Sequence, residues 1–99
     1  MVTVGMYYDV IPGKETTFEE SVEKVIGVLG QDPGHLKSFL YRQVKDASSY
    51  AIISEWSSQE AFVTFIRSDV FRGVTDWGKA EILAHRPSHK VYGAERDSR

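Results

Sequence analysis

Apolar and polar residues alternate at the start of the chain. Between residues 2 and 11, one side carries only apolar or aromatic residues: Val2, Val4, Met6, Tyr8 and Val10. A period of two predicts a β-strand with this side facing a core. Pro12 and Gly13 follow and are typical of a turn.

The period then lengthens to that of a helix. Apolar residues recur at helical spacing as Phe18, Val22, Val25, Ile26 and Leu29. Glutamates crowd the first turns, where the helix dipole favours negative charge. Gly30 and the segment 32–34, Asp-Pro-Gly, end this helix, and Pro followed by Gly predicts a type II turn.

Two further strands and two short helices follow. Residues 35–44 and 50–56 have strand character, and residues 45–49 between them are typical of a hairpin loop. Ser57 with Glu60 is a capping-box signature for a second helix, whose buried face would be Phe62, Phe65 and Ile66.

Ser68 and Asp69 are suited to capping a third helix that carries Phe71, Val74 and Trp77. A last strand is predicted after Pro87, and residues 94–99 form a polar tail. The order β-α-β-β-α-α-β predicts a single α+β domain over residues 1–99. It is typical of a ferredoxin-like fold, with a four-stranded antiparallel sheet and helices on one face.

The other face of this sheet also carries apolar residues. In the first strand that side holds Gly5, Tyr7 and Ile11. A sheet that is apolar on both faces needs a second cover. We therefore expect a symmetric homodimer that packs two sheets face to face.

The composition of the chain argues against several kinds of partner and of functional site. The formal net charge of −2 provides no basic surface for nucleic acid. The chain has no cysteine, which excludes disulfides, thiolate metal sites and thiol catalysis. There is neither a signal-peptide pattern nor an apolar run long enough to span a membrane, so a cytoplasmic location is the default expectation.

Histidines give only a weak indication of a metal site. His85 and His89 are four residues apart, a spacing that would face a metal on a helix, but Pro87 between them breaks helical geometry. A solvated loop before the last strand is the simpler interpretation, and no metal is expected. His35 follows a tight turn and is expected to be partly exposed.

Large aromatic residues are concentrated between residues 54 and 78: Trp56, Phe62, Phe65, Phe71 and Trp77. At helical spacing such rings usually belong to a core. Two short helices joined at a Ser-Asp cap also tend to leave a cleft against a sheet, which these rings would then line. We expect Phe62 to close the floor of this cleft and Phe65, Phe71 and Trp77 to form its rim.

Several short motifs resemble the antibiotic biosynthesis monooxygenase domain. These are Trp56-x-Ser58-x-Glu60-Ala61-Phe62, then Ser68-Asp69-Val70-Phe71, and the earlier Pro33-Gly34. The resemblance runs in order along nearly the whole chain. It implies a dimeric α+β barrel and a functionally mixed family, which includes cofactor-independent quinone-forming monooxygenases, heme-degrading enzymes and isomerases.

The resemblance also suggests site positions. The motif tryptophan of the quinone-forming enzymes is kept as Trp56, their asparagine is replaced by Ile52 and their tyrosine by Phe62, and an arginine could be Arg72. In the heme-degrading branch, the asparagine, tryptophan and histidine fall at or near Met6, Phe65 and Thr75, and none is retained. The resemblance therefore supports heme degradation less than it supports a quinone-forming oxidation.

Two functions follow as hypotheses. The first is a monooxygenase that needs no cofactor and acts with O2 on a small apolar aromatic or phenolic molecule. Trp56, Arg72 and Tyr8 are its catalytic candidates, and Met6, Ile52, Phe62, Phe65, Phe71 and Trp77 would contact the substrate. The second is a non-catalytic protein that binds such a molecule in the same cleft. A third possibility is that side chains close the cleft and the protein acts through its assembly.

Overall fold

The elements follow one another in the predicted order. A computed structural model describes residues 1–74, 82–85 and 87–93. It contains β1 (Val2–Asp9), α1 (Glu15–Leu29), β2 (His35–Arg42), β3 (Ser49–Trp56), α2 (Gln59–Ile66), α3 (Asp69–Val74) and β4 (Ser88–Gly93). The first two strands each end two residues earlier than predicted. Trp77 and the tail 94–99 lie outside the described residues.

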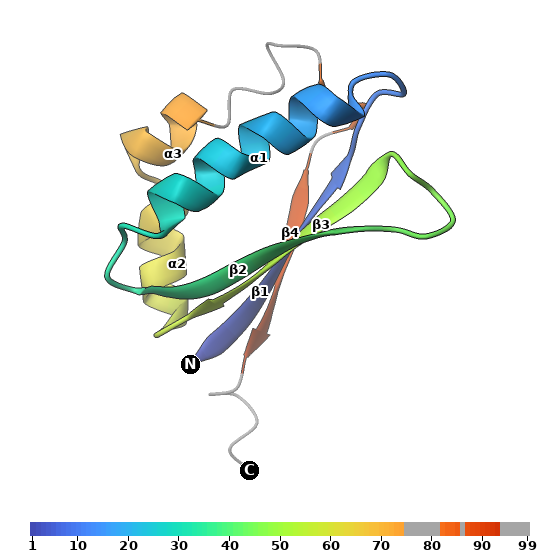
Figure 1. The fold of residues 1–99 in the computed structure, drawn as a ribbon. Coiled ribbons are helices and arrows are strands. Elements are labelled where there is room, and N and C mark those ends of the chain that lie inside the picture. The colour runs from blue at the N-terminus through green and yellow to red at the C-terminus, as the bar shows by residue number, and fades with distance from the viewer. Residues whose placement is uncertain (75–81, 86, 94–99) are drawn as a thin grey trace.

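The four strands form one antiparallel sheet in the order β2-β3-β1-β4. All three helices lie on one face of this sheet, and the opposite face is uncovered (Figure 1). The predicted α+β ferredoxin-like fold is therefore confirmed. None of the described helices is both long and apolar enough to cross a membrane.

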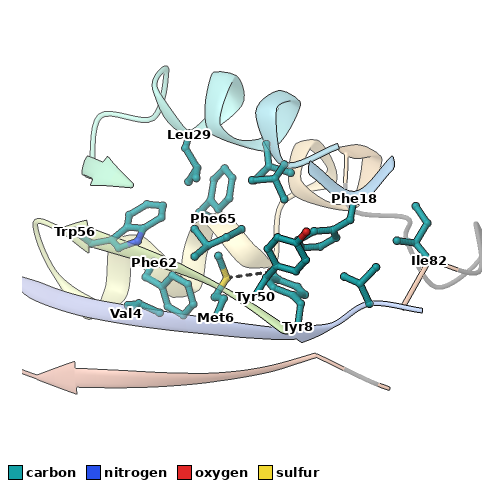
Figure 2. Close-up of a cluster of buried hydrophobic side chains, with 14 of the residues drawn as sticks. Val4, Met6, Tyr8, Phe18, Leu29, Tyr50, Trp56, Phe62, Phe65 and Ile82 are labelled. Carbon is teal, nitrogen blue, oxygen red and sulfur yellow. Dashed lines mark hydrogen bonds between the residues drawn. The ribbon is translucent and has the colours of Figure 1, made fainter. Parts of the chain in front are cut away.

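The core lies between the sheet and the helices. The predicted inner side of β1 is buried, because β1 is central and its Val2, Val4, Met6 and Tyr8 side chains face the helices. Helix α1 buries Phe18, Val22, Val25 and Leu29, as its spacing predicted. Figure 2 shows Phe18 and Leu29 on the same side of the sheet as the rings of Phe65 from α2 and Tyr50 from β3.

Two short helices are capped by serines. The Ser58 Oγ accepts a hydrogen bond of 3.1 Å from the Ala61 N–H, so Ser58, and not the predicted Ser57, is the N-cap of α2. The Ser57 N–H instead donates to the Gly34 carbonyl at 2.8 Å, which joins the end of β3 to the turn before β2. The predicted cap of α3 is confirmed, because the Ser68 Oγ accepts from the Phe71 N–H at 3.1 Å.

The turn at Pro33-Gly34 is closed by a 3.1 Å hydrogen bond from the His35 N–H to the Asp32 carbonyl. The type II prediction was wrong, because among the described glycines only Gly13 has a positive φ, of 96°. Gly34 is needed for another reason. A Cβ atom at this position would lie 2.5 Å from the Cβ of Ala61, so the turn can approach α2 only without a side chain.

Replacing Gly34 by alanine should lower the free energy of unfolding by about 1–3 kcal/mol, the usual cost of overpacking. The double variant Gly34→Ala/Ala61→Gly removes the clashing carbon and should recover part of this loss, although glycine in a helix itself costs about 1 kcal/mol. Urea denaturation of both variants and of Ala61→Gly alone measures the interaction free energy between positions 34 and 61. Strictly additive effects would show that the contact is not the cause.

The uncovered face of the sheet is rich in exposed aromatic rings. Strand register places Tyr7, Phe39, Tyr41 and Tyr92 on this face, and their exposed fractions are 36, 51, 54 and 45%. The Tyr7 and Tyr92 hydroxyls are 2.7 Å apart and share a hydrogen bond. The predicted apolar character of this face is confirmed, whereas Ile11, beyond the end of β1, is only half-buried.

Candidate functional site

A cavity of about 200 Å³ lies between the β1–β4 side of the sheet and the helices α2 and α3. It is lined by Met6, Tyr8, Ile66, Phe71, Pro87, Ser88 and His89. Strand register explains how distant segments meet here, because Met6 of β1 pairs with His89 of β4. Tyr8 is the next residue along the same face of β1.

Tyr8 brings a hydroxyl to this otherwise largely apolar cavity. Its side chain is 4% exposed, and its ring lies 5.3 Å from that of Phe18. The hydroxyl donates to the Met6 Sδ at 3.7 Å (Figure 2), and a thioether is a weak acceptor. Burial raises the pKa of Tyr8 well above its usual value. The hydroxyl therefore keeps its proton at neutral pH and can donate to an anionic oxygen.

His89 adds an imidazole to the cavity wall. The side chain is exposed, and its ring meets the Phe62 ring edge-on at a centroid distance of 5.4 Å. From its sequence, His89 was expected to be a solvated loop residue or, less readily, a metal ligand, and not part of the cleft. The alternation of residues along β4 could have indicated this position from the sequence, because it places His89 on the helix-facing side of the sheet together with Val91. Within the described ranges, no group of three or more His, Cys, Asp or Glu side chains is placed to bind a metal.

Three predicted site residues are packed into the core beside the cavity. Ile52, Trp56 and Phe62 are each 0% exposed, and none of them lines it. The Trp56 ring lies 5.7 Å from Phe62 and 5.4 Å from Phe65. Its Nε1 atom is buried without a hydrogen-bond partner among the described residues. These rings fill the space between α2 and β3.

The remaining candidates are divided between core, cavity and surface. Phe65 is 4% exposed and so lies in the core instead of at the predicted rim. Its ring packs against Phe71 at 5.2 Å, and Phe71 does line the cavity. Arg72 is not part of the cavity lining, because its exposed side chain pairs with Asp69 at 3.3 Å. Of the predicted site residues that the structure describes, Met6, Tyr8 and Phe71 line this cavity.

The chain is similar in sequence to parts of much longer proteins. A protein of Halobacterium salinarum named "Putative heme-binding protein" is 39% identical over 87 residues, which are 88% of this chain and 18% of that protein. A protein of the same name from Natronomonas pharaonis is also 39% identical, over 88% of this chain and 14% of its own length. The chain therefore spans less than a fifth of these two relatives.

Solved structures share the fold at low sequence identity. SnoaB of Streptomyces nogalater, described as a cofactor-independent oxygenase, has a TM-score of 0.81 and 22% identity over 94% of this chain and 91% of its own. A conserved protein of Methanosarcina mazei has a TM-score of 0.82 and 20% identity over 92% of this chain and 89% of its own.

The family profile described as antibiotic biosynthesis monooxygenase matches residues 1–77, which include β1 through α3 and hence most of the cavity wall. With this match over most of its length, the chain belongs to the antibiotic biosynthesis monooxygenase family.

Proposed function

We propose that the chain is a cofactor-independent monooxygenase that oxidises a small phenol with O2 in the cavity between β1, β4 and the helices. The observation that carries this proposal is the position of Tyr8, a buried side chain with a hydroxyl group, in the wall of a mainly apolar cavity. Family membership and the fold shared with a cofactor-independent oxygenase support it.

The proposed reaction needs no other redox partner. A phenolate is electron-rich enough to pass electrons to O2. For a simple phenol, one oxygen atom becomes the second carbonyl of a quinone, and the other leaves as water with the phenolic and ring hydrogens. The protein then has to exclude water, orient the ring and stabilise the anion. Met6, Ile66 and Phe71 provide the apolar wall, and the Tyr8 hydroxyl provides the hydrogen bond.

Cavity size limits the substrate. The volume of about 200 Å³ is below the roughly 300–1,000 Å³ of typical ligand pockets. We infer a substrate of one or two rings, such as a phenol or naphthol, in preference to a larger polycyclic phenol.

Oxygen uptake with a panel of phenols and naphthols tests the proposal. The wild-type protein should consume one O2 for each quinone formed. Tyr8→Phe should lower kcat about 100-fold, as the loss of one donor to an oxyanion does. Tyr7→Phe is a matched control, because it removes the neighbouring hydroxyl on the opposite face of the sheet. Uptake no higher than in buffer would contradict the proposal, as would full activity of Tyr8→Phe.

A non-catalytic binding protein is the alternative. The small number of polar groups in the cavity favours it, since Tyr8, Ser88 and His89 are the polar residues of the lining. Saturable quenching of tryptophan fluorescence by a naphthol, without oxygen uptake, would support this alternative.

The names of the longer relatives suggest heme as a ligand. His89 offers an imidazole on the wall, but a porphyrin is far larger than the one or two rings that about 200 Å³ accommodates. The described residues therefore do not fit an enclosed heme. The matched segment is 18% or less of the length of the relatives that carry this name.

We also propose that the protein acts as a homodimer through the uncovered face of the sheet. Tyr7, Phe39, Tyr41 and Tyr92 are exposed together on this face. A contiguous apolar surface of this kind is typical of a protein–protein contact. Two such sheets packed face to face would cover each other's rings.

A further inference from the structure

We propose that His89 is the general base that removes the phenolic proton, so that the phenolate forms inside the cavity. This inference rests on the proposed monooxygenase function. It assigns the proton-accepting role to β4, a strand that the family profile does not cover.

The positions of Tyr8 and His89 suit a shared phenolic oxygen. His89 pairs with Met6, and Tyr8 lies two residues further along the same face of β1, so the two residues are diagonal neighbours. Such neighbours are about 7–8 Å apart at the backbone. Both line the same cavity. An oxygen that accepts from one side chain and donates to the other needs their polar atoms about 5–6 Å apart, given hydrogen bonds of about 2.7–3.0 Å.

His89 differs from the other two histidines in its surroundings. The His35 Nε2 is 2.7 Å from the Ser38 Oγ, and the His35 ring packs against Trp56. His85 lies in an exposed bend and does not line the cavity. Among the described residues, His89 makes a ring contact with Phe62 and no hydrogen bond that would occupy its nitrogens. Its imidazole is therefore available to a ligand.

Few other charges face His89. Among the described residues of β1, α2 and α3 that meet it in the cavity, Tyr8 is the titratable group, and Met6, Phe62, Ile66 and Phe71 are apolar. Strand alternation directs Lys90 to the uncovered face, where its Nζ lies 5.6 Å from the centre of the Tyr92 ring.

The proton that His89 removes is returned before the end of the reaction. The phenolic O–H bond breaks, the proton moves to an imidazole nitrogen, and the electron pair stays on the oxygen, which accepts from Tyr8. The imidazolium then returns this proton to the reduced oxygen atom that leaves as water. His89 ends each turnover neutral, and O2 is the oxidant.

With a phenol whose anion is coloured, proton removal can be measured separately from oxidation. 4-Nitrophenol is an electron-poor phenol whose anion absorbs visible light, so it reports ionisation in the cavity. The apparent pKa of bound 4-nitrophenol should be lowered by about one to two units in the wild type, because an imidazolium stabilises the anion. His89→Gln should bind the neutral phenol, and the control His85→Gln should behave as the wild type. Absence of binding to the wild type, or an equal shift in His89→Gln, would overturn the inference.

The dependence of kcat on pH gives an independent readout. With an oxidisable naphthol, His89→Gln should be slower by about 100-fold at neutral pH, in the usual range for loss of a general base. The rate should recover above the pKa of the naphthol, where solvent supplies the anion. A pH profile unchanged by His89→Gln would reject the base and leave the monooxygenase proposal intact. Ionisation of 4-nitrophenol that depends on His89, without oxidation of any phenol by the wild type, would support the base and reject the monooxygenase.

Discussion

Replacing Phe62 by alanine should lower the free energy of unfolding by about 3–5 kcal/mol, as large truncations in a packed core do. The Phe62 side chain is 0% exposed. Its ring lies 5.7 Å from the Trp56 ring and 5.4 Å from the His89 ring. Truncation would remove these contacts and leave a cavity between α2 and the sheet. Urea and thermal denaturation monitored by circular dichroism measure the loss.

Phe71→Ala is the matched comparison, because Phe71 is only partly buried and lines the cavity. It should cost clearly less stability and should weaken naphthol binding. Phe65→Ala should resemble Phe62→Ala, since the Phe65 ring is 4% exposed. An equal loss in all three variants would show that Phe71 is an ordinary core residue.

Tyr7→Asp should convert the proposed dimer to monomer or unfold it. Tyr7 is near the middle of the uncovered face, between Ala51 on β3 and Ser88 on β4. A carboxylate at this position would be buried without a partner in the dimer, which costs several kcal/mol. Static light scattering at micromolar concentration, with circular dichroism to confirm folding, gives the measurement.

Thr16→Asp is the control for the added charge, because Thr16 is exposed on α1, on the other side of the molecule. This variant should remain dimeric, and Tyr7→Phe should as well, since it keeps the ring. A monomeric wild type at micromolar concentration would contradict the proposed dimer directly.

The order of the elements and most of the core follow from local patterns in the sequence. The alternation in β1 and the helical spacing of Phe18, Val22 and Leu29 are local signals, and burial followed them. The serine cap of α3 was also predicted, whereas the cap of α2 was displaced from Ser57 to Ser58. Adjacent serines offer the same capping chemistry, so the sequence alone does not distinguish Ser57 from Ser58.

Which side chains meet at the cavity depends on how the helices and strands pack together. Helical spacing predicted that Phe62 lies deeper than Phe71, but it also placed Phe65 at the rim, and the packing of α2 puts Phe65 in the core with Trp56 and Phe62. Arg72 turns outward to Asp69 on its own helix. His89 reaches the cavity because β4 pairs with β1, a register between strands more than 80 residues apart in the chain. The alternation of β4 indicates which face of the sheet His89 occupies, but local spacing cannot show which distant strand β4 pairs with, so the cavity position of His89 follows only from the pairing.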